Sequence, residues 1–123
     1  MKIKEAINLI DMQKHNTYSQ GEKIGWLSKV DGMVKRLIID THEGGVDVVF
    51  TGYDDMTDPE TELLVPAPFD GLYIRYLETM IDYTNGEYDK YNNTMMMFKS
   101  EYDTYASYYN RNHMPKGSKI KFF

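Results

Sequence analysis

Residues 69–113 read FDGLYIRYLETMIDYTNGEYDKYNNTMMMFKSEYDTYASYYNRNH, and this stretch decides the fold. Large apolar and aromatic side chains recur in it at alternating steps of three and four residues, with one threonine as the exception. The positions are Ile74, Leu77, Ile81, Thr84, Tyr88, Tyr91, Met95, Phe98, Tyr102, Tyr105 and Tyr109. A period of about 3.5 residues, held over roughly five heptads, is the pattern of a helix that buries one narrow stripe. The stretch therefore predicts long helical structure packed along a seam.

The stripe is most simply core packing, but it uses tyrosine where leucine would be usual. A buried tyrosine needs a partner for its hydroxyl, so a tyrosine-rich seam is typical of the half-wet surfaces between subunits. Methionines fill irregular gaps and adapt to partners, which makes the run at 95–97 a second candidate contact. The candidate interface on this stretch is Tyr91, Met95, Met96, Met97, Tyr102 and Tyr109.

An exposed ladder of aromatic rings could instead stack nucleic-acid bases, which requires basic neighbours to hold the phosphates. The charges beside the stripe are mostly acidic: Glu87, Asp89, Glu101 and Asp103 against Lys90 and Lys99. The net charge of the chain is −5, which also argues against general nucleic-acid binding.

Two signals disagree at Asn85-Gly86. The dipeptide is typical of a helix stop or a turn, whereas the unbroken heptad register favours one continuous helix. A break lets residues 69–84 fold back on residues 87–112 as a helical hairpin. Continuity gives a rod of more than about 40 residues, roughly 60 Å long. We expect a break or a sharp bend, because a chain of 123 residues seldom contains such a rod.

The first part of the chain predicts two further helices. The earlier one starts near Ile3 and fades near Lys14, and the later one starts at Gln20 after a capping box made by Ser19 and Glu22. Its apolar face comprises Ile24, Leu27, Val30, Val34, Leu37, Ile38 and Thr41, and Gly44-Gly45 ends it. Pro68 fits the first position of the helix that follows.

The expected fold is mainly α: a bundle of about four helices in a single domain over residues 1–112, followed by a basic C-terminal arm over residues 113–123.

The middle of the chain has a different character. Residues 46–66 contain two β-prone runs, Val46–Phe50 and Leu63–Val65, separated by an acidic, turn-rich stretch. We expect either an irregular segment or a short β-hairpin here, or an arm that becomes ordered against a neighbouring subunit. Residues 44–70 hold seven acids and no Lys or Arg. Within them the candidate interface residues are Asp54, Asp55 and Asp58.

The arm over residues 113–123 has the opposite charge. Its last eight residues hold three lysines and no acid, and it finishes with Phe122 and Phe123. These two phenylalanines are candidate interface residues, because such an arm could dock on a neighbour; a frayed terminus explains the same composition. Acidic middle and basic arm together predict electrostatic contacts between copies or with a partner, although solvated loops account for each alone.

Motifs for chemistry are missing from the sequence. There are no cysteines, and His15, His42 and His113 fall in separate contexts without a second ligand at metal-site spacing. The acidic stretch lacks the ligand alternation and central glycine of a calcium loop. Neither a phosphate-binding loop nor a nucleophile elbow occurs. We therefore expect no enzyme activity, cofactor, metal or membrane span; a catalytic site assembled from distant residues is an alternative with no motif behind it.

Three strings carry a resemblance to a known group of proteins. They are ELLVPAPFDGLY at 62–73, IDYTNGEYDKYNN at 81–93 and YYNRNHMP at 108–115. With these strings the chain resembles small proteins of tailed phages and prophages of Gram-positive bacteria, and the resemblance extends over nearly its whole length. It implies a head–tail connector, also called an adaptor or head-completion protein. Such proteins are mainly helical, form a ring beneath the portal and have no known catalysis.

The resemblance sets the functional expectation: a structural virion protein that assembles with itself as a ring, contacts the portal and other connector or tail proteins, and encloses double-stranded DNA only as passing cargo. The location it implies is the head–tail interface of the virion, after assembly in the host cytoplasm. Residues 44–70 would line the channel, where a basic surface would hold the duplex, or form an arm between subunits. The alternative is a small phage-encoded helical regulator that binds a host or phage partner.

Overall fold

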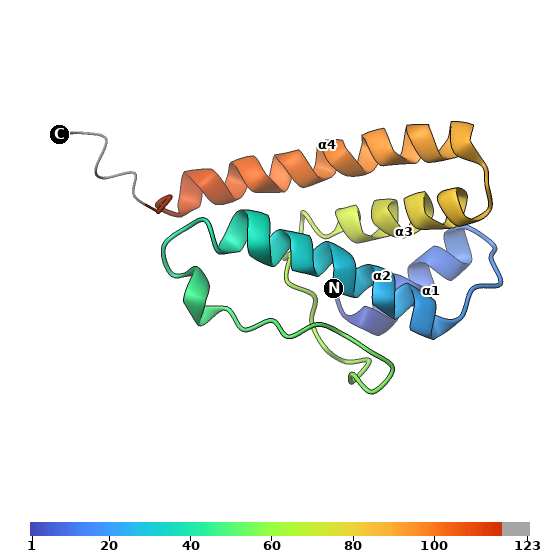
Figure 1. Cartoon of the computed structure of the whole chain (residues 1–123), viewed down its shortest axis with the longest axis horizontal. Coiled ribbons are helices and arrows are strands. Elements are labelled where there is room, and N and C mark those ends of the chain that lie inside the picture. The colour runs from blue at the N-terminus through green and yellow to red at the C-terminus, as the bar shows by residue number, and fades with distance from the viewer. Residues whose placement is uncertain (117–123) are drawn as a thin grey trace.

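The computed structural model describes residues 1–116 and consists of helices joined by irregular segments (Figure 1). The α-helices are α1 (Ile3–Gln13), α2 (Gln20–Val34), α3 (Gly71–Thr84) and α4 (Tyr88–Asn112). A π-helical turn, η1 (Lys35–Ile39), extends α2, and a 3-10 turn, η2 (Gly45–Asp47), follows it. The prediction of a mainly α fold with four helices is confirmed.

The chain breaks at Asn85-Gly86, as expected. Gly86 has a φ of 76°, the left-handed conformation that glycine adopts without strain, and the Glu87 amide donates to the Asp82 carbonyl at 2.9 Å. Helix α4 then runs back along α3, with the two lying side by side in Figure 1. Most of the heptad stripe packs on itself, because Ile74, Leu77 and Ile81 of α3 and, from α4, Phe98, Tyr105 and Tyr109 are all buried. Two of its positions beside the turn, Thr84 and Tyr88, are exposed instead.

The second helix begins where the capping box predicts, with the Glu22 amide donating to Ser19 Oγ at 3.1 Å. It ends differently, because its last turn is π: the Asp40 amide reaches back five residues to the Lys35 carbonyl at 2.8 Å. This turn shifts the phase of the helix, so Ile39 is buried while Leu37 is 59% exposed. Thr41 is exposed as well, so the expectation that Leu37 and Thr41 lie on the buried apolar face is wrong.

The expected β-hairpin is also absent. Within residues 1–116 no strand forms, and the two β-prone runs do not pair with each other. Leu63 and Val65 are instead buried against the helices, whereas Val49 is 82% exposed. The second run bonds to the N-terminus of the chain instead of to the first run, since the Leu63 amide donates to the Met1 carbonyl at 2.9 Å. Of the alternatives for 46–66, the irregular segment is confirmed and the hairpin is wrong, while an arm ordered against a neighbouring subunit stays a prediction.

Helix α3 starts three residues later than its sequence predicts. Its first residue is Gly71 and its N-cap is Asp70, so Pro68 does not occupy the first helical position. Pro66 and Phe69 form a separate turn before the helix, in which the Phe69 amide donates to the Pro66 carbonyl at 3.0 Å. This turn places Phe69 over α4, where its ring packs on Tyr105 and Tyr108.

All four helices contribute to one core. Helix α1 supplies Ile3, Ala6, Ile7 and Ile10, helix α2 supplies Leu27, Val30 and Val34, and helix α3 supplies Leu72, Leu77 and Ile81. The buried salt bridge between Lys14 Nζ and Asp82 Oδ1, 2.5 Å long, joins the chain just after α1 to the end of α3. Thr94 of α4 donates to the other oxygen of the Asp82 carboxylate at 3.1 Å. The helical frame is thus fixed at the end where the α3–α4 hairpin turns.

Candidate functional site

A fully buried carboxylate in the last turn of α2, that of Asp31, fixes the position of the acidic segment. Asp31 Oδ1 accepts from the Tyr73 hydroxyl at 2.5 Å, and Oδ2 accepts from the Tyr53 hydroxyl at 2.6 Å and the Leu64 amide at 3.0 Å. Burial raises the pKa of Asp31, and these three donors oppose that rise. Hydrogen bonds from neutral groups, with no ion pair among the described residues, hold this carboxylate in the core.

The two tyrosines remain protonated donors in this arrangement. Burial and the neighbouring Asp31 carboxylate raise the pKa of Tyr53 and that of Tyr73. The Tyr73 hydroxyl also accepts from the Val65 amide at 2.7 Å, so it is both donor and acceptor. The segment from Tyr53 to Val65 is therefore attached to α2 at its first end and to both α2 and α3 at its second end.

Sequence reasoning missed Asp31, although one signal was present. It lies four residues after Leu27 and three before Val34, inside the apolar face of its helix. An acid in that position is a candidate for a buried polar hub, because buried charges require hydrogen-bond partners.

The acids of the middle segment divide into two groups. Glu60 pairs with Lys2 at 2.8 Å and with Lys4, and these hydrogen bonds lower the pKa of Glu60 to about 2. By contrast, the three acids predicted as interface residues are exposed and have no ion pair within the described part of the chain: Asp54, Asp55 and Asp58. Between them lies Met56, 90% exposed. The turn at 54–58 thus presents negative charge around an apolar tip.

The aromatic candidates lie mostly in the seam between α3 and α4. Tyr109 is buried, with its ring stacked on His113 at 3.7 Å between centroids, so it contributes to the chain's own core. Tyr91, Met95 and Tyr102 are half-buried. The Tyr102 hydroxyl is buried and has no hydrogen-bond partner among the described residues.

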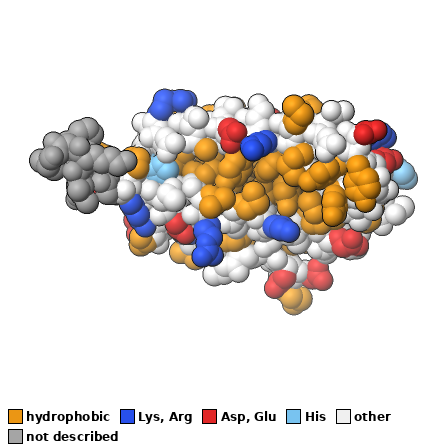
Figure 2. Space-filling view, turned by 45° about the horizontal axis from the view of Figure 1, so that its top comes forward, with side chains coloured by type: hydrophobic (Ala, Val, Ile, Leu, Met, Phe, Trp, Pro, Cys, Tyr) orange, Lys and Arg blue, Asp and Glu red, His pale blue; other side chains and the backbone are white. Residues whose placement is uncertain are grey.

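The methionine candidates are more accessible. Met96 is 71% exposed and Met97 is 44% exposed, both on α4. Figure 2 shows hydrophobic side chains gathered in a continuous band across one face of the molecule, with charged side chains along its margins. An apolar band of this kind on a folded protein is typical of an interaction surface.

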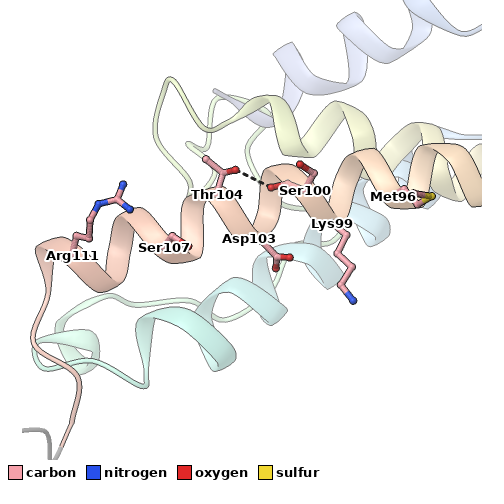
Figure 3. A pocket seen from close by; sticks show the side chains of 7 residues that line it. All are labelled: Met96, Lys99, Ser100, Asp103, Thr104, Ser107 and Arg111. Carbon is pink, nitrogen blue, oxygen red and sulfur yellow. Dashed lines mark hydrogen bonds between the residues drawn. The ribbon is translucent and has the colours of Figure 1, made fainter.

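The outer face of α4 is an open stripe of small and charged side chains rather than an enclosed cavity. Figure 3 shows its lining residues, all from this one helix: Met96, Lys99, Ser100, Asp103, Thr104, Ser107 and Arg111. Thr104 uses its hydroxyl within the helix, donating to the Ser100 carbonyl at 2.9 Å. A surface formed by a single helix can be approached by another helix, but it does not surround a small ligand.

Two histidines lie close together at the C-terminal end of α4. The sequence did not predict this, because His42 and His113 fall in separate contexts. The rings of His42 and His113 are 6.4 Å apart between centroids, while His42 contacts Asn110 Oδ1 through Nε2 at 2.5 Å. The chain is held here by backbone bonds from Glu43 to Met114 and from Lys116 to Thr41. No group of three or more potential metal ligands occurs within residues 1–116. Phe122 and Phe123 lie outside the described residues.

No helix of the described part is both long and apolar enough to cross a bilayer. Comparisons of the chain with protein-family models, with curated proteins and with solved structures found no match.

Proposed function

We propose that this protein is a structural phage virion component, a head–tail connector that forms a ring on the portal and links it to the tail. Two observations carry the proposal: the apolar band of Figure 2, and the exposed methionines Met96 and Met97 of α4. Three sequence strings resemble phage proteins, at 62–73, 81–93 and 108–115. This resemblance supports phage assembly proteins as the partners of the apolar band.

A ring subunit needs a rigid frame and lateral contact surfaces. The α3–α4 hairpin supplies the frame, because its seam is closed by large buried side chains. Methionines adapt to irregular partners, and Met and aromatic residues are enriched at the centres of protein interfaces. The same surface in a regulator would bind a host protein, which is the alternative that the experiment below separates.

The uncompensated acids fit a component through which DNA passes. Asp54, Asp55 and Asp58 carry no ion pair in the described chain, and duplex DNA carries one negative charge per about 1.7 Å of axis. Because the net charge of the chain is −5, the subunit has no general electrostatic hold on the duplex, even where these acids contact a neighbouring copy. In this proposal DNA is cargo, and the protein contacts are with itself, the portal and the tail-side proteins.

The test is assembly with portal rings from the same phage genome, followed by native mass spectrometry and particle imaging. We expect a stoichiometric ring of this subunit on the portal. Met96→Lys with Met97→Lys should prevent its formation, since two cations would replace two exposed apolar side chains of α4. Met12→Lys is the matched control, because Met12 is 83% exposed on α1, and it should assemble normally.

Absence of any complex with the portal, alone or with the other small head–tail proteins, would overturn the connector role and favour the regulator. Equal assembly of the wild type and the double methionine variant would reject α4 as the contact surface.

A further inference from the structure

The acidic turn has a charge that its own chain leaves uncompensated. The nearby acids are satisfied: Glu60 pairs with Lys2 and Lys4, and Glu62 pairs with the amino terminus of Met1 at 3.2 Å. Asp54 and Asp58 accept backbone amides, which shape the turn but bring no positive charge. The turn therefore fits a cationic partner.

A groove adjoins this turn. It is lined by residues 49–53 and by Thr57, Thr61, Glu62 and Leu64. Val49 is 82% exposed at its edge, and the ring of Phe50 packs edge-on against Tyr53 at 5.2 Å between centroids. Its walls combine aromatic and aliphatic groups with one carboxylate, a composition suited to a segment that alternates cations with apolar residues.

The chain itself contains a segment of that composition. After Lys116 the sequence continues Gly-Ser-Lys-Ile-Lys-Phe-Phe, with cations at Lys119 and Lys121 and aromatic residues at Phe122 and Phe123. It has no acid, whereas residues 44–70 have no Lys or Arg. The charges and the apolar groups of the two segments are complementary.

The chain after Lys116 is too short to bring Lys119 or Lys121 to the acidic turn of the same molecule. The Lys116 amide is bonded to the Thr41 carbonyl, just beyond η1, while Asp55 lies against Gly21 in the first turn of α2, where an added Cβ would be 2.6 Å from Asp55 Oδ1. The helix between these points is about 30 Å long. Extended chain carries Lys119 at most about 11 Å, and Lys121 about 18 Å, from Lys116. Figure 1 agrees, since the turn 54–58, at the bottom of the view, lies well along the long axis from the end where the chain leaves α4.

We propose that residues 117–123 of one copy bind the acidic turn 54–58 and its groove on a second copy. The lysines face the turn, and a phenylalanine enters the groove. The inference rests on the proposed ring, for which it specifies the contact between neighbouring subunits. Such a contact is heterologous: each copy gives its tail to one neighbour and receives a tail from the other, which generates a closed ring when the rotation between copies closes.

The experiment uses the full chain, which contains no cysteine, so single cysteines report single contacts. Copies with Met56→Cys are mixed with copies carrying Phe122→Cys, joined by a short bismaleimide and analysed by mass spectrometry. We expect a covalent heterodimer in at least about tenfold higher yield than with Met12→Cys, the exposed control on α1.

Charge reversal tests the specificity. Lys119→Glu with Lys121→Glu in the Phe122→Cys copy should lower the yield about tenfold, since two exposed ion pairs are lost and repulsion replaces them. Asp54→Lys with Asp58→Lys in the Met56→Cys copy should restore it. Recovery between two reversed copies shows that both variants are folded.

A heterodimer yield equal to the Met12→Cys control, or a yield unaffected by charge reversal, overturns the contact. So does intrachain joining when both cysteines are placed in one dilute chain. Portal assembly of the unlabelled chain, run in parallel, separates the two proposals. A ring on the portal without tail-to-turn joining rejects only the contact, and joining without a portal complex rejects only the connector role.

Discussion

The hydroxyl of Tyr73 donates to Asp31 Oδ1 at 2.5 Å and so connects α3 to the last turn of α2, where neither residue is reached by solvent. The same hydroxyl accepts from the Val65 amide at 2.7 Å. One oxygen atom thus joins two helices and the end of the acidic segment. Its removal leaves two buried groups unsatisfied, which costs more than the loss of one ordinary hydrogen bond.

Tyr73→Phe should therefore lower the free energy of unfolding by about 3 kcal/mol, because a buried carboxylate loses a donor and a buried amide loses its acceptor. Tyr53→Phe is the matched control. It removes a donor to the same carboxylate from a half-buried ring, and should cost about 1.5 kcal/mol. Urea unfolding of both variants and the wild type measures the difference. Equal losses in the two variants would contradict the double role of the Tyr73 hydroxyl.

Stability should also depend on the protonation of Asp31. Burial raises the pKa of Asp31 in the folded chain, so the folded state binds the proton more tightly than the unfolded state does. The contribution of protonated Asp31 to the free energy of unfolding is greatest below the pKa of Asp31 in the unfolded chain, about 3.9. This contribution is lost as pH rises through the pKa of Asp31 in the folded chain. Asp31→Asn has no such titration. The stability of the wild type relative to Asp31→Asn should fall as pH rises from about 4 to 7 in urea unfolding; a constant or growing difference would contradict this.

Glu60 should titrate in the opposite direction. Hydrogen bonds from Lys2 and Lys4 lower the pKa of Glu60 to about 2, so its stabilising contribution is present above the unfolded pKa of about 4.3 and is lost as pH falls towards 2. Carbon-detected NMR of the Glu60 carboxyl should give a midpoint near 2. Lys2→Met with Lys4→Met should raise that midpoint, and an unchanged midpoint would show that the lysines are not the cause.

Two glycines should respond oppositely to alanine. A Cβ at Gly45 would lie 2.3 Å from the Ile39 carbonyl oxygen, which is backbone and cannot move aside, whereas a Cβ at Gly25 meets nothing within 4 Å. Gly45→Ala should cost about 2 kcal/mol through this clash. Gly25→Ala should stabilise the chain by up to about 1 kcal/mol, because alanine favours a helix interior. Thermal unfolding measures both, and a loss in Gly25→Ala as large as that in Gly45→Ala would refute the steric account.

The helices could be predicted because their signals are local. The stripe from Ile74 to Tyr109 indicated both halves of the hairpin, and Asn85-Gly86 marked the turn between them. The buried face at the end of α2 could not be predicted from the hydrophobic pattern alone. The π turn changes the helix period, so Leu37 and Ile39 exchange the environments that a regular helix assigns to them.

The attachment of the acidic segment depends on contacts between residues far apart in the chain. Asp31, Tyr53 and Tyr73 are separated by 20 residues or more, and nothing local identifies them as partners. The β-prone run at Leu63–Val65 was misread for the same reason. Its apolar side chains enter the helical core, and the Val65 amide is satisfied by a hydroxyl instead of a second strand.

The π turn also determines which helix the end of α2 meets. A regular helix rotates by about 100° per residue, so the one residue that a π turn adds resets the direction of every side chain after it. Before the turn, α2 packs on α1 and α3; from the turn onward, η1 packs on α4. The continuous helical segment α2–η1 therefore packs first on α1 and α3 and then on α4, and the extra residue of the π turn rotates its side chains from one set of neighbours to the other.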